Sequence, residues 1–147
     1  MSKLTIAMIA HDSKKEDIVQ FAKQHREALK TANIIATRNT GHLIQERTGL
    51  TVTLLQSGPM GGDLQIGAMV ANGMIDAVIF LRDALKAQPH EPEISSLLRV
   101  CGVHNIPIAL NLSTAVAVLH LITQHPACPG KLFQAHMPER VEAVLCK

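Results

Sequence analysis

Aromatic residues are scarce in this chain of 147 residues: they make up 2%, with three phenylalanines and neither tryptophan nor tyrosine. Proteins that bind single-stranded nucleic acid stack bases on aromatic side chains, and Phe21, Phe80 and Phe133 are too few and too scattered for that. The net charge is only +2, and the basic residues form no arm or cluster. We therefore do not expect nucleic acid as a partner.

Long apolar runs and metal-binding cysteine motifs are also missing. No stretch approaches the ~20 apolar residues of a membrane span, and the apolar run near the N-terminus is too short for the core of a signal peptide. Cys101, Cys128 and Cys146 are odd in number and form no CxxC pair. These absences predict a cytoplasmic protein with free thiols and no membrane contact.

Apolar residues are abundant, at 47% of the chain against 18% charged, which predicts a single domain over residues 1–147 with a core of Ile, Val, Leu, Ala and Met. Short apolar segments alternate with segments of helical spacing. The strands are expected at 3–10, 33–36, 51–56, 75–81 and 106–110, and the helices at 14–30, 41–47, 63–71, 93–103 and 113–123. The segment 125–147 begins with HPACPG and is weakly patterned, so it is expected to be a terminal strand or helix.

Strands that are apolar throughout are buried on both faces, which is typical of a parallel sheet covered by helices. We therefore predict an α/β fold: an open, doubly wound, three-layer α/β/α domain whose five parallel strands have the order 3-2-1-4-5. Ligands of such domains bind beyond the carboxyl ends of the strands. The segments that follow the predicted strands carry most of the reactive side chains, whereas the opposite loops carry few.

Two of these segments suit a phosphate group. Donors precede predicted helices, whose N-termini favour anions, and Lys15 adds a positive charge. The candidate phosphate contacts are Lys15, Thr37, Asn39, Thr40, Ser57 and Gly58, with Gly41 allowing a close backbone approach. The chain has neither a Walker A motif nor GxGxxG, so a small phosphorylated metabolite fits better than a nucleotide. The alternative is that these Thr and Ser residues are ordinary helix caps and turn formers.

The segment SGPMGGDLQIG places Asp63 at the start of a helix, directly after two glycines that permit a sharp turn. The helix N-terminus is expected to favour the ionised carboxylate. A carboxylate beside a bound phosphate ester can take a proton from a carbon next to a carbonyl group. The alternative is that Asp63 only caps the helix.

The segment RDALKAQPHEPE adds Asp83, His90 and Glu93. Two prolines stiffen the loop around His90, whose neutral imidazole can stabilise an enediolate oxygen, while Asp83 or Glu93 can orient it or relay protons. The alternatives are a surface loop, or a metal site that also includes His11 and Asp12. No HExxH or comparable spacing supports a metal, so none is expected.

Together these motifs resemble the methylglyoxal synthase family, in register from about residue 4 to residue 115. The resemblance rests on AHD, the Thr-rich turn, SGPMGGDxQxG, PHEP and NIPIALN followed by STA. It implies a homohexameric lyase that converts dihydroxyacetone phosphate into methylglyoxal and inorganic phosphate without a metal or organic cofactor. It also implies that phosphate acts as an inhibitor and allosteric effector.

Residue by residue, the resemblance makes Asp63 the catalytic base and His90 the contact to the carbonyl and hydroxyl oxygens. Asp83 matches a site aspartate, and Glu93 takes the place of an aspartate that assists proton transfer. The matches to substrate-binding positions are His11, Asp12, Lys15, Thr37, Asn39, Thr40, Ser57 and Gly58.

The chain departs from the family pattern at several places. Glu93 is one methylene longer than the usual aspartate, Arg38-Asn39 replaces Gly-Thr, Ala84 replaces a proline, and Val116 stands where an acidic residue is usual. These departures leave open an alternative function, a regulatory domain of the same fold that senses phosphate or a phosphometabolite without turnover.

Overall fold

The computed structural model describes residues 3–124, which form a five-stranded parallel sheet of order β3-β2-β1-β4-β5. The strands are β1 (Thr5–Ala10), β2 (Asn33–Ala36), β3 (Val52–Leu54), β4 (Ala77–Leu81) and β5 (Ile108–Ala109). The predicted doubly wound fold and strand order are therefore confirmed. The strand or helix expected at 125–147, and with it Cys128, Phe133 and Cys146, lies outside the described residues.

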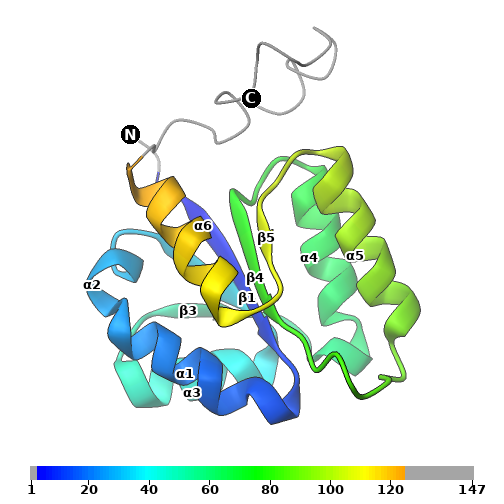
Figure 1. The fold of residues 1–147 in the computed structure, drawn as a ribbon, viewed down its shortest axis with the longest axis horizontal. Coiled ribbons are helices and arrows are strands. Elements are labelled where there is room, and N and C mark those ends of the chain that lie inside the picture. The colour runs from blue at the N-terminus through cyan, green and yellow to red at the C-terminus, as the bar shows by residue number, and fades with distance from the viewer. Residues whose placement is uncertain (1–2, 125–147) are drawn as a thin grey trace, which may run out of the picture.

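Helices cover both faces of the sheet (Figure 1). One layer holds α4 and α5, and the other holds α1, α3 and α6. The helices are α1 (Lys15–Gln24), α2 (Arg26–Leu29), α3 (Arg38–Thr48), α4 (Gly62–Ala71), α5 (Glu91–Val103) and α6 (Leu112–Gln124), with short 3-10 turns η1 (Asp12–Lys14) and η2 (Gly58–Met60).

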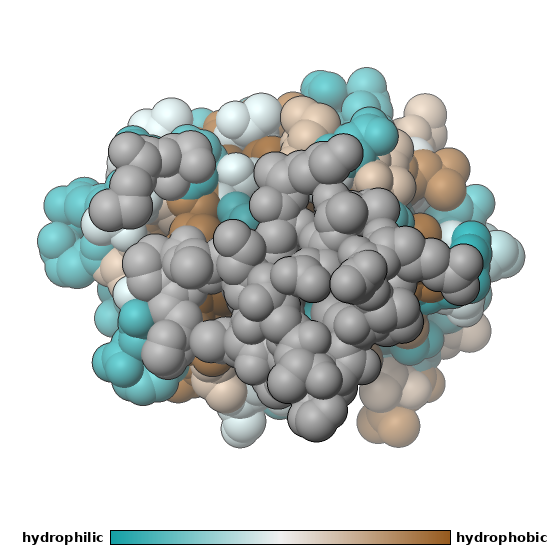
Figure 2. Space-filling model, turned by 90° about the horizontal axis from the view of Figure 1, so that it is seen from above, coloured by the Kyte–Doolittle hydropathy of each residue, from teal (hydrophilic) through white to brown (hydrophobic). Residues whose placement is uncertain are grey.

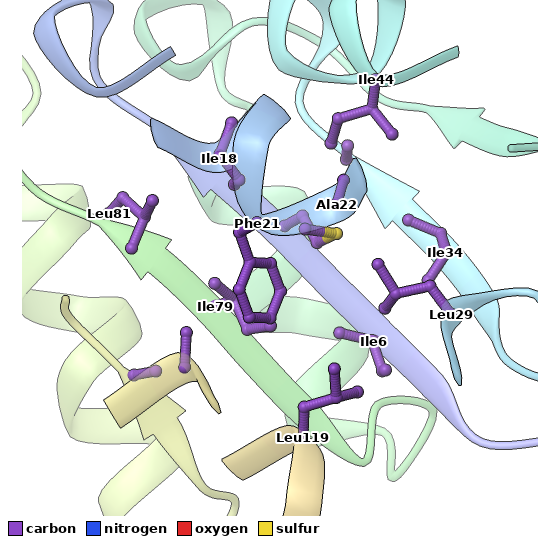
Figure 3. Close-up of a cluster of buried hydrophobic side chains, with 14 of the residues drawn as sticks. Ile6, Ile18, Phe21, Ala22, Leu29, Ile34, Ile44, Ile79, Leu81 and Leu119 are labelled. Atoms are coloured by element: carbon purple, nitrogen blue, oxygen red, sulfur yellow. The ribbon is translucent and has the colours of Figure 1, made fainter. Parts of the chain in front are cut away.

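The alternation of side chains along β1 divides the core in two. Ile6 and Met8 face the layer of α1, α3 and α6, whereas Ala7 and Ile9 face α4 and α5. Phe21 of α1 lies at the centre of the first cluster, over the strands (Figure 3). Burial on both faces explains why the strands read as continuous apolar runs.

Several predicted boundaries were wrong. The helix expected over 14–30 is interrupted at His25, where Arg26 turns to donate from Nε to the carbonyl oxygen of Thr48, 2.7 Å away, at the end of α3. Helix α3 begins at Arg38 rather than at residue 41, and α5 begins at Glu91 rather than at residue 93. Strands β3, β4 and β5 are shorter than expected. Ile75 before β4 is buried outside the sheet, whereas Thr51, Gln56 and Leu110, which flank β3 and β5, are exposed.

The loops that follow the strands converge on one edge of the sheet, and Figure 2 looks onto the opposite edge, where the strands begin. Hydrophobic and hydrophilic residues are mixed in the coloured part of that view. Within residues 3–124, no helix has both the length and the hydrophobicity needed to cross a bilayer.

Candidate functional site

A cavity of about 180 Å³ opens beyond the carboxyl ends of β1 to β4. It lies where the chain switches direction across the sheet, because β1 has β2 on one side and β4 on the other. Its wall is formed by Ile9, Ala10, His11, Asp12, Lys15, Thr37, Asn39, Ser57, Gly58, Pro59, Asp63, Gln88 and His90. Nine of these residues were predicted from the sequence as catalytic or substrate-binding residues: His11, Asp12, Lys15, Thr37, Asn39, Ser57, Gly58, Asp63 and His90.

Two glycines shape the turn that brings Asp63 to the cavity. Gly61 has φ +101°, in the left-handed region that favours glycine. A Cβ on Gly62 would lie 2.1 Å from the backbone oxygen of Gln56, so only glycine fits this close approach. The sharp turn predicted from Gly-Gly-Asp is therefore confirmed, and it sets Asp63 in the first turn of α4.

Asp63 does not cap its helix, so the capping alternative was wrong. The side chain is 1% exposed, yet neither carboxylate oxygen has a hydrogen-bond partner among the described residues. Burial raises the pKa of Asp63. The nearby His90 lowers this pKa, and the negative charge of Glu93 raises it further. Burial thus acts against the ionised form, which the helix N-terminus is expected to favour. A buried carboxylate without donors is a stronger base than an exposed one.

His90 faces Asp63 from the loop that precedes α5. Its Nε2 lies 3.3 Å from Asp63 Oδ2, and the residue is only 8% exposed, so the alternative of a surface loop histidine was wrong. Gly58 makes room for this pair: a Cβ there would lie 3.0 Å from His90 Nε2 and 3.6 Å from Asp63 Oδ1. A Cβ at residue 58 would therefore press on His90 and make ordinary contact with Asp63.

His11 presents a second imidazole to the cavity. The backbone N–H of Asp83 donates to His11 Nδ1 at 2.9 Å. Because Nδ1 accepts this hydrogen bond, the neutral ring carries its proton on Nε2. Burial lowers the pKa of His11, and the neighbouring His90 lowers it further. His11 Nε2 is buried and has no partner within residues 3–124. This nitrogen is therefore a hydrogen-bond donor available to a ligand.

Lys15 supplies the positive charge of the opposite wall. Its Nζ donates to the backbone oxygen of Ala10 and, at 2.9 Å, to Thr40 Oγ1. Burial lowers the pKa of Lys15, while the negative charges of Asp12 and Asp63 oppose this shift. The amine is thus held by two neutral oxygens on the wall of the cavity, where its charged form can pair with an anion.

The N-terminus of α3 lies beside Lys15. Thr37 stands at the cap position but its side chain does not cap the helix; its Oγ1 instead donates to Thr40 Oγ1, 3.3 Å away. The backbone N–H of Arg38 donates to Gln56 O. No side chain of the described residues accepts a hydrogen bond from the next backbone N–H groups of α3, so these groups can bind an anion.

Gly41 plays a different role from the one expected. A Cβ there would lie 2.3 Å from Leu54 Cδ2, so the absence of a side chain allows α3 to pack closely against β3.

Three predicted residues lie off the cavity wall. Thr40 is buried behind Lys15. The carboxylate of Asp83 accepts hydrogen bonds from Ser13 Oγ and from the N–H of Leu85, which together lower its pKa, and only its backbone N–H serves the site. Glu93 affects Asp63 through its charge alone.

Gln88 lines the cavity from the loop before His90 but was not among the predicted site residues. Its position in the sequence between Asp83 and His90 could have indicated that it lies at the site.

A metal site was not expected, and the described part of the chain holds no group of three His, Cys, Asp or Glu side chains arranged to bind a metal ion.

The chain is similar to known proteins over most of its described length. The family described as MGS-like domain matches residues 17–110. Methylglyoxal synthase of Moorella thermoacetica is 54% identical over 123 residues, which cover 84% of this chain and 96% of the relative. Methylglyoxal synthase of Carboxydothermus hydrogenoformans is 56% identical over 119 residues, covering 81% and 98%.

The structure is similar as well. The crystal structure of methylglyoxal synthase from Elizabethkingia anophelis NUHP1 superposes with a TM-score of 0.75 at 44% identity, covering 80% of this chain and 77% of that chain. Sequence and structure agree, and the chain belongs to the methylglyoxal synthase family.

Proposed function

We propose that this protein is a lyase that eliminates phosphate from dihydroxyacetone phosphate, yielding methylglyoxal and inorganic phosphate. The names of its relatives support this activity. The observation that carries the proposed mechanism is the Asp63 carboxylate, which is buried, accepts no hydrogen bond from residues 3–124 and faces His90 inside the cavity.

The phosphate group of the substrate binds at the end of the cavity lined by Lys15, Thr37, Asn39, Ser57 and Gly58. The ammonium of Lys15 and the first turn of α3 provide positive charge there. Asp63 lies beside Gly58, so a substrate held by its phosphate extends its hydroxymethyl carbon toward the carboxylate.

In the proposed reaction, Asp63 takes a proton from the hydroxymethyl carbon, and the electron pair of the C–H bond moves to form an enediolate. His90 and the Nε2–H of His11 stabilise the oxygens of this intermediate. The C–O bond to phosphate then breaks with both electrons leaving on phosphate. The remaining enol gains a proton at its terminal carbon and loses its hydroxyl proton, which gives methylglyoxal, and the proton held by Asp63 is released with phosphate. Asp83 contributes through its backbone N–H, which orients His11, and Glu93 through the pKa of Asp63.

A phosphate-sensing domain without turnover is the alternative function. A sensor for an anion gains nothing from a buried, unpartnered carboxylate next to the anion site, because the two negative charges repel. The Asp63–His90 pair therefore favours catalysis.

Incubation of the purified protein with dihydroxyacetone phosphate tests the proposal. We expect equal amounts of methylglyoxal and inorganic phosphate. Formation of glyceraldehyde 3-phosphate would indicate an isomerase, and binding without product would indicate a sensor. Inhibition by phosphate and a homohexamer stay predictions of the family resemblance, which kinetics with added phosphate and light scattering in solution test.

A further inference from the structure

One carboxylate closes the loop between β4 and α5. Glu91 is the first residue of α5, and both of its oxygens are used: Oε2 accepts from Arg82 NH2 at 2.9 Å, and Oε1 accepts from the N–H of Gln88 at 3.1 Å. Arg82 directly follows β4. The two contacts therefore tie the end of the loop to its beginning.

The same loop sets the position of both imidazoles. Asp83 donates its backbone N–H to His11 Nδ1, and His90 directly precedes Glu91. Gln88, held by Glu91, lines the cavity. A shift of this loop would thus move His90, Gln88 and the N–H that orients His11 together.

From these contacts we propose that Arg82 and Glu91 form a positioning pair, which holds the 82–90 loop so that His90 and His11 face Asp63. Neither residue lines the cavity, so neither is a catalytic residue. The inference rests on the proposed function for its kinetic readout.

The environment of the pair supports a specific role. The side chains of Arg82 and Glu91 are 29% and 33% exposed, less than those of the ion pair Arg47–Glu16 on the surface, at 40% and 68%. Arg82 Nε is buried without a partner in the described residues, so Glu91 is the contact that orients the guanidinium. The two charges also oppose each other at His11, since Glu91 raises its pKa and Arg82 lowers it.

Two single variants and their double variant test the pair kinetically. Glu91→Gln keeps an acceptor for Gln88 but removes the charge, and Arg82→Met keeps most of the apolar stem. Because a misplacement of about 1 Å can cost about 100-fold, we expect each variant to lose about tenfold to 100-fold in kcat. KM should change less than about threefold, because the phosphate contacts lie elsewhere.

The double variant should be no slower than the slower single variant, since both changes break the same contact. Arg82→Lys should recover part of kcat. Glu16→Gln, which breaks the Arg47–Glu16 pair of 3.1 Å, is the matched control and should stay within about twofold of wild type. Wild-type kcat in both single variants, or losses that multiply in the double variant, would overturn the proposal.

Amide hydrogen exchange provides a readout that does not depend on the reaction. In Glu91→Ala, exchange at Gln88 and Asp83 should be at least about tenfold faster than in wild type, with core amides unchanged. Unchanged exchange at both amides would overturn the positioning role, even if the wild-type protein proved to have no lyase activity. Absence of methylglyoxal with accelerated loop exchange would instead overturn the proposed function alone. Should Arg82→Met fail to fold, Glu91→Gln and Arg82→Lys carry the same comparison.

Discussion

Asp63 Oδ2 and His90 Nε2 lie 3.3 Å apart at the carboxyl edge of the sheet, brought together from α4 and from the loop that leads into α5. Both side chains are buried, and no donor in the described part of the chain hydrogen-bonds the oxygens of Asp63. The pair therefore combines a carboxylate that is poorly solvated with an imidazole that faces the same space. Gly58 is the neighbour that makes this arrangement sterically possible.

Gly58→Ala should impair catalysis because the added methyl group would lie 3.0 Å from His90 Nε2. We expect kcat to fall by about tenfold to 100-fold. Gly67→Ala in α4 is the control, since its Cβ would meet no atom within 4 Å. That variant should keep wild-type kcat and gain about 0.5–1 kcal/mol of stability in urea unfolding. Equal kcat in Gly58→Ala and Gly67→Ala would contradict the steric role of Gly58.

The pH profile of kcat/KM should report the raised pKa of Asp63. The base must be ionised, so activity falls as pH drops through this pKa, and the acid limb should have its midpoint above the ordinary value of 3.8. Glu93→Gln removes a negative charge that raises the pKa of Asp63, so the limb should move to lower pH. A limb that stays in place in Glu93→Gln would rule out this electrostatic contact.

His11 should make stability depend on pH in a defined direction. Its folded pKa is lowered from 6.5, so just below pH 6.5 the unfolded chain binds a proton that the folded protein does not. The contribution of His11 to stability is complete above pH 6.5 and is lost as pH falls toward the folded pKa. The free energy of unfolding in urea, measured for wild type and His11→Asn between about pH 5 and 7.5, tests this prediction, because this range includes the ordinary histidine pKa of ~6.5. Parallel pH curves for the two proteins would disprove it.

Lys15→Met should weaken anion binding more than it slows chemistry. A hydrogen bond to a charged group contributes about 1.5–3 kcal/mol, so KM and the inhibition constant of phosphate should rise by about tenfold to 100-fold. Lys14→Met is the control, because Lys14 does not line the cavity. An unchanged affinity for phosphate in Lys15→Met would place the anion elsewhere.

The parallel sheet and the Gly-Gly-Asp turn could be predicted because each depends on local pattern. Apolar runs reveal strands that are buried on both faces, and a glycine pair reveals a turn that no side chain permits. The helix boundary at Arg38 was missed because the start of α3 is set by a contact from Gln56, which is distant in sequence.

The environment of individual groups was harder to predict than their presence in the site. The direction of the Asp63 pKa shift depends on burial, which the sequence does not show. Asp83 reaches the site through its backbone rather than its carboxylate, since Ser13 and Leu85 engage that carboxylate. Spacing along the chain identifies which loops meet, whereas the side chains that face the cavity depend on how each loop folds.

The steady-state rate of methylglyoxal formation by Asp63→Asn tests the central claim most directly. Removal of a general base costs about 10²- to 10⁴-fold, so kcat should fall by that factor while KM stays within about threefold. The melting temperature should not fall, because a neutral amide is easier to bury than a carboxylate without hydrogen bonds. A folded Asp63→Asn protein with near wild-type kcat would contradict the assignment of Asp63 as the base.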